Sequence, residues 1–86
     1  MNNPHRLSLL LCAVMACASC GASEDTVFTL YRNSALDPQM RIHVATFDAA
    51  DGEKYNSENC TQAAELFRGQ PGVKTRFWCE KGHFKK

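Results

Sequence analysis

Downstream of residue 22, the order of apolar and polar residues predicts strands and one helix. Thr26 to Arg32 is rich in β-branched and aromatic residues and apolar on both faces, which is typical of a central strand. Met40 to Asp48 alternates with a period of two residues, and this predicts a second strand. Val73 to Cys79 alternates in the same way and predicts a third. Turn-forming residues separate these segments at 33–38 and at Asp51-Gly52.

A helix is predicted between the second and third strands. Asn56 suits its N-cap position, because the side chain can accept a hydrogen bond from the first backbone amides of a helix. The helix is expected to end before Gly69 and Pro71, which both favour termination. Its apolar stripe consists of Cys60, Ala63, Ala64 and Phe67, at the spacing of one helical face.

The element order is therefore β-β-α-β. A right-handed crossover makes the second and third strands parallel to each other. If the first strand is central, the third pairs antiparallel with it, and the order across the sheet is 2-1-3. We prefer this order because the first strand is apolar on both faces, while order 1-2-3 stays open. The prediction is a small α+β domain with a three-stranded, mainly antiparallel sheet and one helix on one face.

Cys60 and Cys79 fall on the apolar faces of the predicted helix and third strand. A disulfide between them would cross the core. Residues 23–86 form a domain of 64 residues, and at this size one core rarely supplies more than ~3–5 kcal/mol. A bridge that closes a loop of roughly 20 residues contributes about 3 kcal/mol through chain entropy. We predict this disulfide.

Residues 1–22 have the features of a secretory signal peptide. Arg6 and the terminal amine supply positive charge, Leu7 to Ala18 forms an apolar run, and small residues continue to Ala22. The run is too short to span a bilayer, which takes about 20 apolar residues. We therefore predict an exported chain whose mature domain, 23–86, enters an oxidising compartment where disulfides persist.

Cys17-Ala18-Ser19-Cys20 resembles the lipobox of bacterial lipoproteins, in which the last cysteine receives lipid and becomes the new N-terminus. The segment departs from that pattern at its first position, where Cys17 stands in place of the usual Leu. The resemblance implies a chain lipidated at Cys20 and anchored in the periplasm or outer envelope. The alternative is ordinary cleavage after Ala22 and a freely soluble, extracellular protein. Both outcomes leave Cys60 and Cys79 as an even pair.

Charge and patterning favour binding by one face of the sheet. After the signal the chain carries nine acidic and nine basic residues, so a basic nucleic-acid binder is not indicated. The face opposite the helix is expected to meet solvent and to mix cations with aromatic residues. Such a face suits a protein, a glycan or another anionic envelope ligand. Its candidate binding residues are Arg41, His43, Lys74, Arg76 and Trp78, with Phe47 beside them and Val27, Thr29 and Tyr31 between the outer strands.

Catalytic and metal sites have little support in the sequence. No nucleophile-elbow pattern surrounds Ser34 or Ser57. His43 and Asp48 are five residues apart on one strand, so their side chains point to opposite faces. No Cys-x-x-Cys pair follows the signal. We therefore expect no catalytic residue, metal or cofactor, and a non-catalytic envelope module that acts by binding. A soluble secreted inhibitor or interaction protein presenting loop 33–38 or 48–54 is the alternative, and a small hydrolytic enzyme is a third reading.

The exported protein should begin at Cys20 or Ser23. Intact-mass measurement of the product would separate the two cases, because lipid adds its mass to Cys20. Cys20→Ala should then release a soluble product if the anchor is lipid. A mature product that retains Met1 would contradict export.

Overall fold

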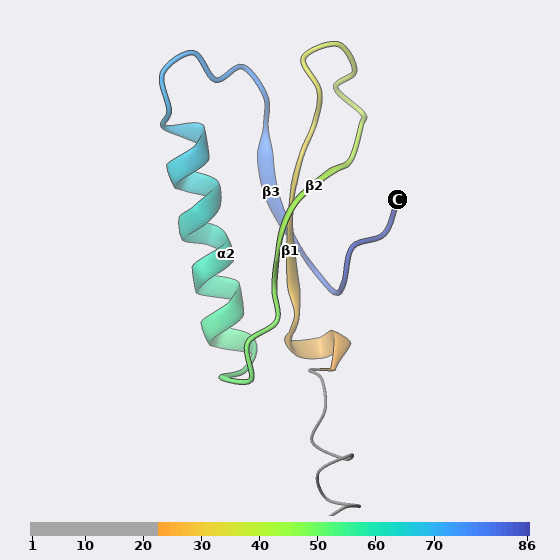
Figure 1. Ribbon diagram of the computed structural model, residues 1–86, viewed down its shortest axis with the longest axis vertical. Helices are drawn as coiled ribbons and strands as arrows, with labels where there is room; N and C mark the ends of the chain where they lie inside the picture. The colour runs from red at the N-terminus through yellow and green to blue at the C-terminus, as the bar shows by residue number, and fades with distance from the viewer. Residues whose placement is uncertain (1–22) are drawn as a thin grey trace, which may run out of the picture.

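Residues 23–86 are described by a computed structural model, in which one α-helix packs on one face of a three-stranded sheet (Figure 1). The predicted signal segment 1–22, Cys20 included, lies outside the described residues. Within 23–86, no helix is both long and apolar enough to cross a membrane. The elements in chain order are a 3-10 turn η1 (Glu24–Thr26), β1 (Phe28–Arg32), β2 (Ile42–Phe47), α2 (Glu53–Arg68) and β3 (Phe77–Lys81).

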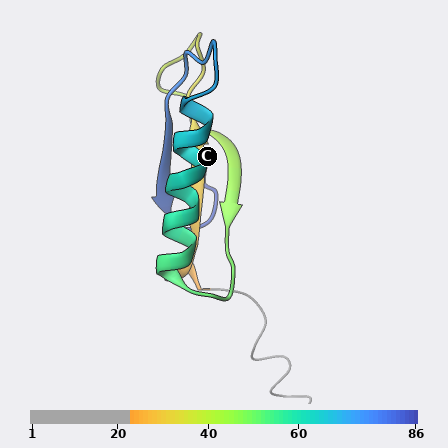
Figure 2. The ribbon, with the colours of Figure 1, turned by 90° about the vertical axis from the view of Figure 1, so that its left-hand side faces the viewer.

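The strand order is β2-β1-β3, which confirms the preferred topology. β1 pairs antiparallel with both neighbours. Its middle residues, Thr29, Leu30 and Tyr31, are buried although their side chains alternate between the two faces. The helix lies against a single face of the sheet, and Figure 2 shows it in front of the strands. The apolar character of the first strand on both faces thus reflects its central position.

The core between α2 and the sheet is built around a disulfide. Leu30, Ala64 and Phe77 are buried together with Cys60. Cys60 and Cys79 are joined, with an S–S distance of 2.04 Å and a Cα–Cα distance of 6.2 Å. The predicted bridge from helix to third strand is therefore confirmed. Further hydrophobic side chains pack against this cluster and are partly buried: Phe28, Val44, Ala45, Phe47, Ala63 and Cys79.

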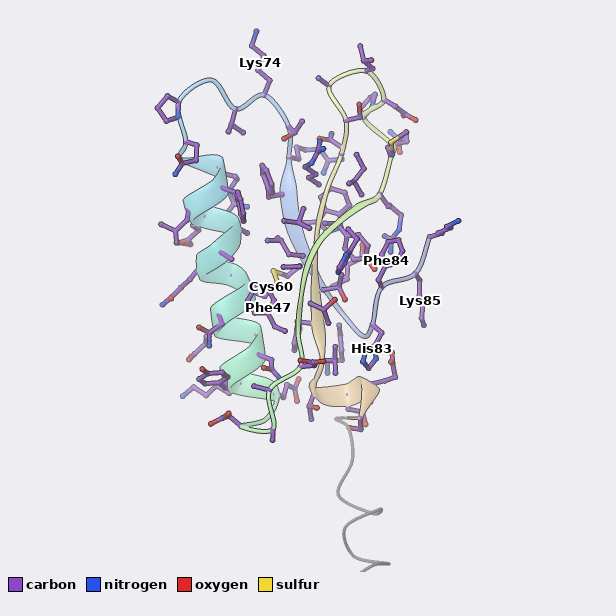
Figure 3. All side chains as sticks on the ribbon, viewed as in Figure 1. Phe47, Cys60, Lys74, His83, Phe84 and Lys85 are labelled. Carbon is purple, nitrogen blue, oxygen red and sulfur yellow. A yellow bond between two sulfur atoms is a disulfide. The ribbon has the colours of Figure 1, made fainter. Side chains whose placement is uncertain are left out.

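A β-bulge in β2 overturns one part of the predicted pattern. Leu30 lies opposite Ala45, but Tyr31 lies opposite His43, so Val44 is an extra residue in the ladder. Beyond it every side chain changes face. Phe47, expected to point outward, packs against the core and lies between α2 and the sheet (Figure 3). Thr46, the residue before Phe47, bonds through Oγ1 with His43 Nε2 at 2.7 Å.

The helix begins earlier than predicted, and Asn56 has a different role. α2 starts at Glu53, and Gly52, with φ of +108°, is its N-cap. Asn56 is buried in the first turns. Its Oδ1 accepts from the backbone N–H of Ala49 at 3.0 Å, and its Nδ2 donates to the backbone oxygens of Ala49 and Thr26. The prediction of Asn56 as N-cap was wrong, since its amide instead joins the loop before α2 to the turn η1.

The predicted third strand begins too early. β3 starts at Phe77, so the predicted strand residues 73–76 belong to a loop. Beyond Arg32 the side chain of Asn33 supplies one of the two hydrogen bonds to Arg76, because its Oδ1 accepts from the Arg76 N–H at 2.8 Å. The Asn33 N–H in turn donates to the Arg76 carbonyl at 3.2 Å. Lys74 therefore lies in a loop and is not part of the sheet.

Replacing Cys60 by Ala should lower the free energy of unfolding by roughly 2–5 kcal/mol, because the bridge constrains the unfolded chain and occupies the core. Urea unfolding of the oxidised wild type and of Cys60→Ala measures this difference. In denatured, unreduced wild type neither Cys60 nor Cys79 should react with a thiol reagent. Two reactive thiols would show that the bridge does not form in the exported protein.

Candidate functional site

The outer face of the sheet, opposite α2, is a packed layer with Tyr31 at its centre. Tyr31 is only 1% exposed. The Trp78 ring stacks on it with a centroid distance of 5.8 Å. The Arg41 guanidinium lies over the same ring, 4.3 Å from its centroid. The expectation of a solvent-exposed face was therefore wrong for the central strand, where Thr29 and Tyr31 are both buried.

Glu80 on β3 is joined to Arg41, the residue just before β2, whose guanidinium lies over Tyr31. Arg41 donates from Nη1 to Glu80 Oε2, and Trp78 Nε1 donates to the same oxygen at 2.7 Å. The Arg41 guanidinium, and after it the Trp78 N–H, hold the pKa of the Glu80 carboxyl below its usual value of 4.5. The same hydrogen bond raises the pKa of Arg41. The charge of Arg41 is thus already neutralised within the protein.

The C-terminal tail, residues 82–86, folds back at the end of β3. Gly82 has a φ of +105°, which suits glycine, and a Cβ there would lie 2.9 Å from Glu24 Oε2. Its N–H donates to the Val27 carbonyl at 2.7 Å, and its own carbonyl accepts from the Thr29 hydroxyl at 2.7 Å. Sequence reasoning missed this turn, although a glycine directly after a strand is a recognisable signal.

Beyond the turn, the tail lies on the outer face. The Phe84 ring lies 5.1 Å from the His43 ring and 6.0 Å from the Tyr31 ring, centroid to centroid. The Lys85 N–H donates to the Tyr31 hydroxyl at 3.1 Å, and the Lys85 carbonyl accepts from Arg41. Figure 3 shows Phe84 and Lys85 on the side of the sheet away from α2. The tail therefore covers the middle of the face that was expected to meet solvent.

The start of the tail is also held by charge. His83 Nδ1 pairs with Glu24 Oε1, and the His83 backbone N–H donates to Glu24 Oε2 at 3.1 Å. These hydrogen bonds from His83 lower the pKa of Glu24. Both side chains are about half exposed, so solvent screens the pair. Its contribution is chiefly to fix the direction of the tail.

Arg76 differs from Arg41 in its surroundings. The ion pairs within residues 23–86 are Arg41–Glu80, Lys81–Glu53 and His83–Glu24, so Arg76 has no carboxylate partner in that part of the chain. It is exposed, and its guanidinium lies 5.1 Å from the centre of the Trp78 ring. Its Nη2 donates to the Pro38 carbonyl at 3.2 Å. Arg76 thus presents an unneutralised, oriented cation beside an aromatic ring.

The structure gathers four of the five predicted binding residues. Arg41, His43 and Trp78 surround Tyr31, and Arg76 adjoins Trp78. Lys74 does not join them, because it lies on the loop between α2 and β3, at the end of the molecule (Figure 3). The candidate binding residues are therefore Arg76, Trp78 and the exposed His43. Arg41 instead pairs with Glu80 and packs on the Tyr31 ring.

Comparisons with protein-family models, with curated proteins and with solved structures gave no match. Within residues 23–86, no three His, Cys, Asp or Glu side chains are grouped so that they could hold a metal ion. What the surface can do must therefore follow from its own residues: an exposed guanidinium, a half-buried indole and an exposed imidazole.

Glu80 should make stability depend on pH. Its pKa is depressed in the folded protein, so the Arg41–Glu80 pair stabilises the fold above the unfolded pKa, and this contribution is lost as pH falls through the folded pKa. Glu80→Gln should therefore lower the melting temperature at pH ~7 more than at pH ~3. The effect should be about 1 kcal/mol or less, because both side chains are slightly more than a third exposed and solvent screens the pair.

Thermal unfolding at both pH values, followed by circular dichroism, measures the difference. Glu58→Gln is the matched control, since this exposed helix carboxylate forms no ion pair within residues 23–86. The same loss of stability for Glu80→Gln at both pH values would contradict the assignment.

Proposed function

We propose that this chain is an exported, non-catalytic module of the bacterial envelope that binds an anionic partner through Arg76 and Trp78. The export signal and the lipobox-like segment ending at Cys20 support an envelope location, and lipid on Cys20 would supply the anchor. The observation that carries the binding proposal is the unneutralised Arg76 guanidinium held beside the Trp78 ring.

The contrast between two arginines supports this assignment. Arg41 is paired with Glu80 and contributes to the packing on Tyr31. Arg76 adds no ion pair to the described fold, but its hydrogen bond to Pro38 restricts its orientation. A planar guanidinium forms two parallel hydrogen bonds to a carboxylate or phosphate. A cation that is oriented without being neutralised loses less conformational entropy when it meets such a group.

Trp78 supplies an apolar surface next to that cation. Its ring is half-buried, since one side stacks on Tyr31 and its N–H is satisfied by Glu80. Aromatic side chains held in this way present area without a large loss of rotamer freedom. The exposed His43 lies on the same face of the sheet. Together these groups fit an anionic group attached to a flat apolar or sugar surface.

Arg76→Glu should abolish retention of the natural partner, because it replaces the attracting charge by a repelling one. The measurement is affinity retention from an envelope extract on immobilised exported protein, followed by protein and glycan analysis. Lys54→Glu is the matched control: it makes the same change of charge on an exposed residue of α2, at the opposite side of the sheet. Partner retained by wild type and Lys54→Glu, and lost by Arg76→Glu, is the expected result.

Circular dichroism should show both variants folded, since Arg76 contributes only one exposed side-chain hydrogen bond. If a folded Arg76→Glu variant retains the same partner as wild type, binding does not use this surface.

A further inference from the structure

The end of the molecule formed by loops 33–41 and 69–76, here called the loop end, has a composition that the fold does not require. Figures 1 and 2 both show the two loops side by side beyond the ends of β1 and β3. Leu36 is 96% exposed at this end, and Met40 and Val73 are 44% and 36% exposed. A turn that served only to join two strands would favour polar residues. Three exposed apolar side chains on these two loops call for an explanation.

The loop that carries Leu36 is firmly braced. The N–H of Ser34 donates to the Asp37 carbonyl and the N–H of Asp37 donates to the Ser34 carbonyl, each at 3.2 Å. The Leu36 N–H donates to the Ser34 hydroxyl at 3.1 Å. Asn33, which is 6% exposed, binds both Arg76 and the Pro38 carbonyl. The loop thus holds Leu36 out in water without relying on any contact of its side chain.

The charges around this apolar tip are mainly positive. Lys74 and Arg76 lie on the second loop, and neither has a carboxylate partner within residues 23–86. Asp37 is the opposing charge in the first loop, and its carboxylate accepts from the Gln39 N–H at 3.0 Å. A projecting apolar group flanked by cations complements an anionic lipid surface, where the apolar group enters the interface and the cations meet headgroups.

We propose that the loop end docks onto the surface of an anionic bilayer, with Leu36 inserted and Lys74 at the headgroups. A bilayer accepts a convex tip, whereas a partner protein would need a complementary pocket. An extended mode of protein binding is disfavoured, because the main-chain groups of Ser34 and Asp37 bind each other and are not available to pair with a second strand. A symmetric contact between the loop ends of two copies of the chain would bring Lys74 and Arg76 of one copy close to the same cations of the other. Arg76 contributes to this surface only as a second cation, and the variants that test the proposal change Leu36 and Lys74, so it can be tested apart from the function proposed above.

The test is co-sedimentation with vesicles, using exported protein that carries Cys20→Ala so that no acyl chain contributes. Wild type should bind vesicles of phosphatidylglycerol and phosphatidylethanolamine, and bind phosphatidylcholine vesicles far less. Leu36→Ser should weaken binding by about tenfold or more, because it removes the inserted apolar group. Lys74→Glu should weaken it by a similar factor, about tenfold, through the reversed charge. Leu36→Phe, which keeps a large apolar side chain at this position, should bind as the wild type does.

Two control variants test position as well as composition. Tyr55→Ser removes an apolar side chain that is 50% exposed at the far end of α2, and Lys54→Glu reverses a charge beside it. Both should bind vesicles as wild type does. Because Leu36 makes no packing contact to lose, its variants should also keep the wild-type melting temperature.

No binding to the anionic vesicles, or equal binding by wild type and folded Leu36→Ser, would overturn the proposal. Equal binding to phosphatidylcholine would overturn the role of Lys74. A partner protein retained by wild type and lost with Leu36→Ser, in the absence of vesicle binding, would assign the loop end to protein recognition instead. Loss of the Arg76-dependent partner leaves these outcomes unchanged, so the two proposals fail separately.

Discussion

The covalent bond between Cys60 and Cys79 is the constraint on which the domain depends. The buried cluster between α2 and the sheet holds few side chains: Leu30, Ala64 and Phe77 lie with Cys60 at its centre. A core of this size gives a short chain little margin over its conformational entropy. The disulfide fastens α2 to β3, an edge strand that pairs only with β1 in the three-stranded sheet. Its position at the centre of the apolar cluster lets one bond hold helix, sheet edge and core together.

The sequence predicted the architecture well because the signals that determine it are local. A first strand that is apolar on both faces identified β1 as central, and alternation together with helical spacing placed Cys60 and Cys79 on facing surfaces. The detailed faces of β2 could not be predicted. Period-two alternation is correct up to His43 and wrong from Ala45 onward, because a bulge at Val44 leaves no clear mark in the residue pattern. Phe47 was misplaced for this reason alone.

Most residues of the candidate site could be predicted from the sequence, but the role of each residue could not. Cations and aromatics on the outer face were correctly grouped, apart from Lys74, which lies in a loop, and Phe47, which packs against the core. What sequence could not provide was their pairing. Arg41 reaches Glu80 over the Tyr31 ring, a contact between residues 39 positions apart, while Arg76 is left unneutralised in the described chain. The tail beyond Gly82 covers the same face through contacts more than 50 positions apart. Long-range partners, rather than residue type, decide which arginine is available for binding.

The loop end and the N-terminal end of the described domain lie at opposite poles of the long axis, with η1 at one and the loops at the other (Figure 1). A tether attached at Cys20 would leave only a few residues between a lipid and Ser23. The loop end would then be the part of the domain farthest from the lipid anchor. If both proposals hold, the loop end would then meet a second surface opposite the anchoring membrane, and the disulfide-stapled domain would be the spacer between the two.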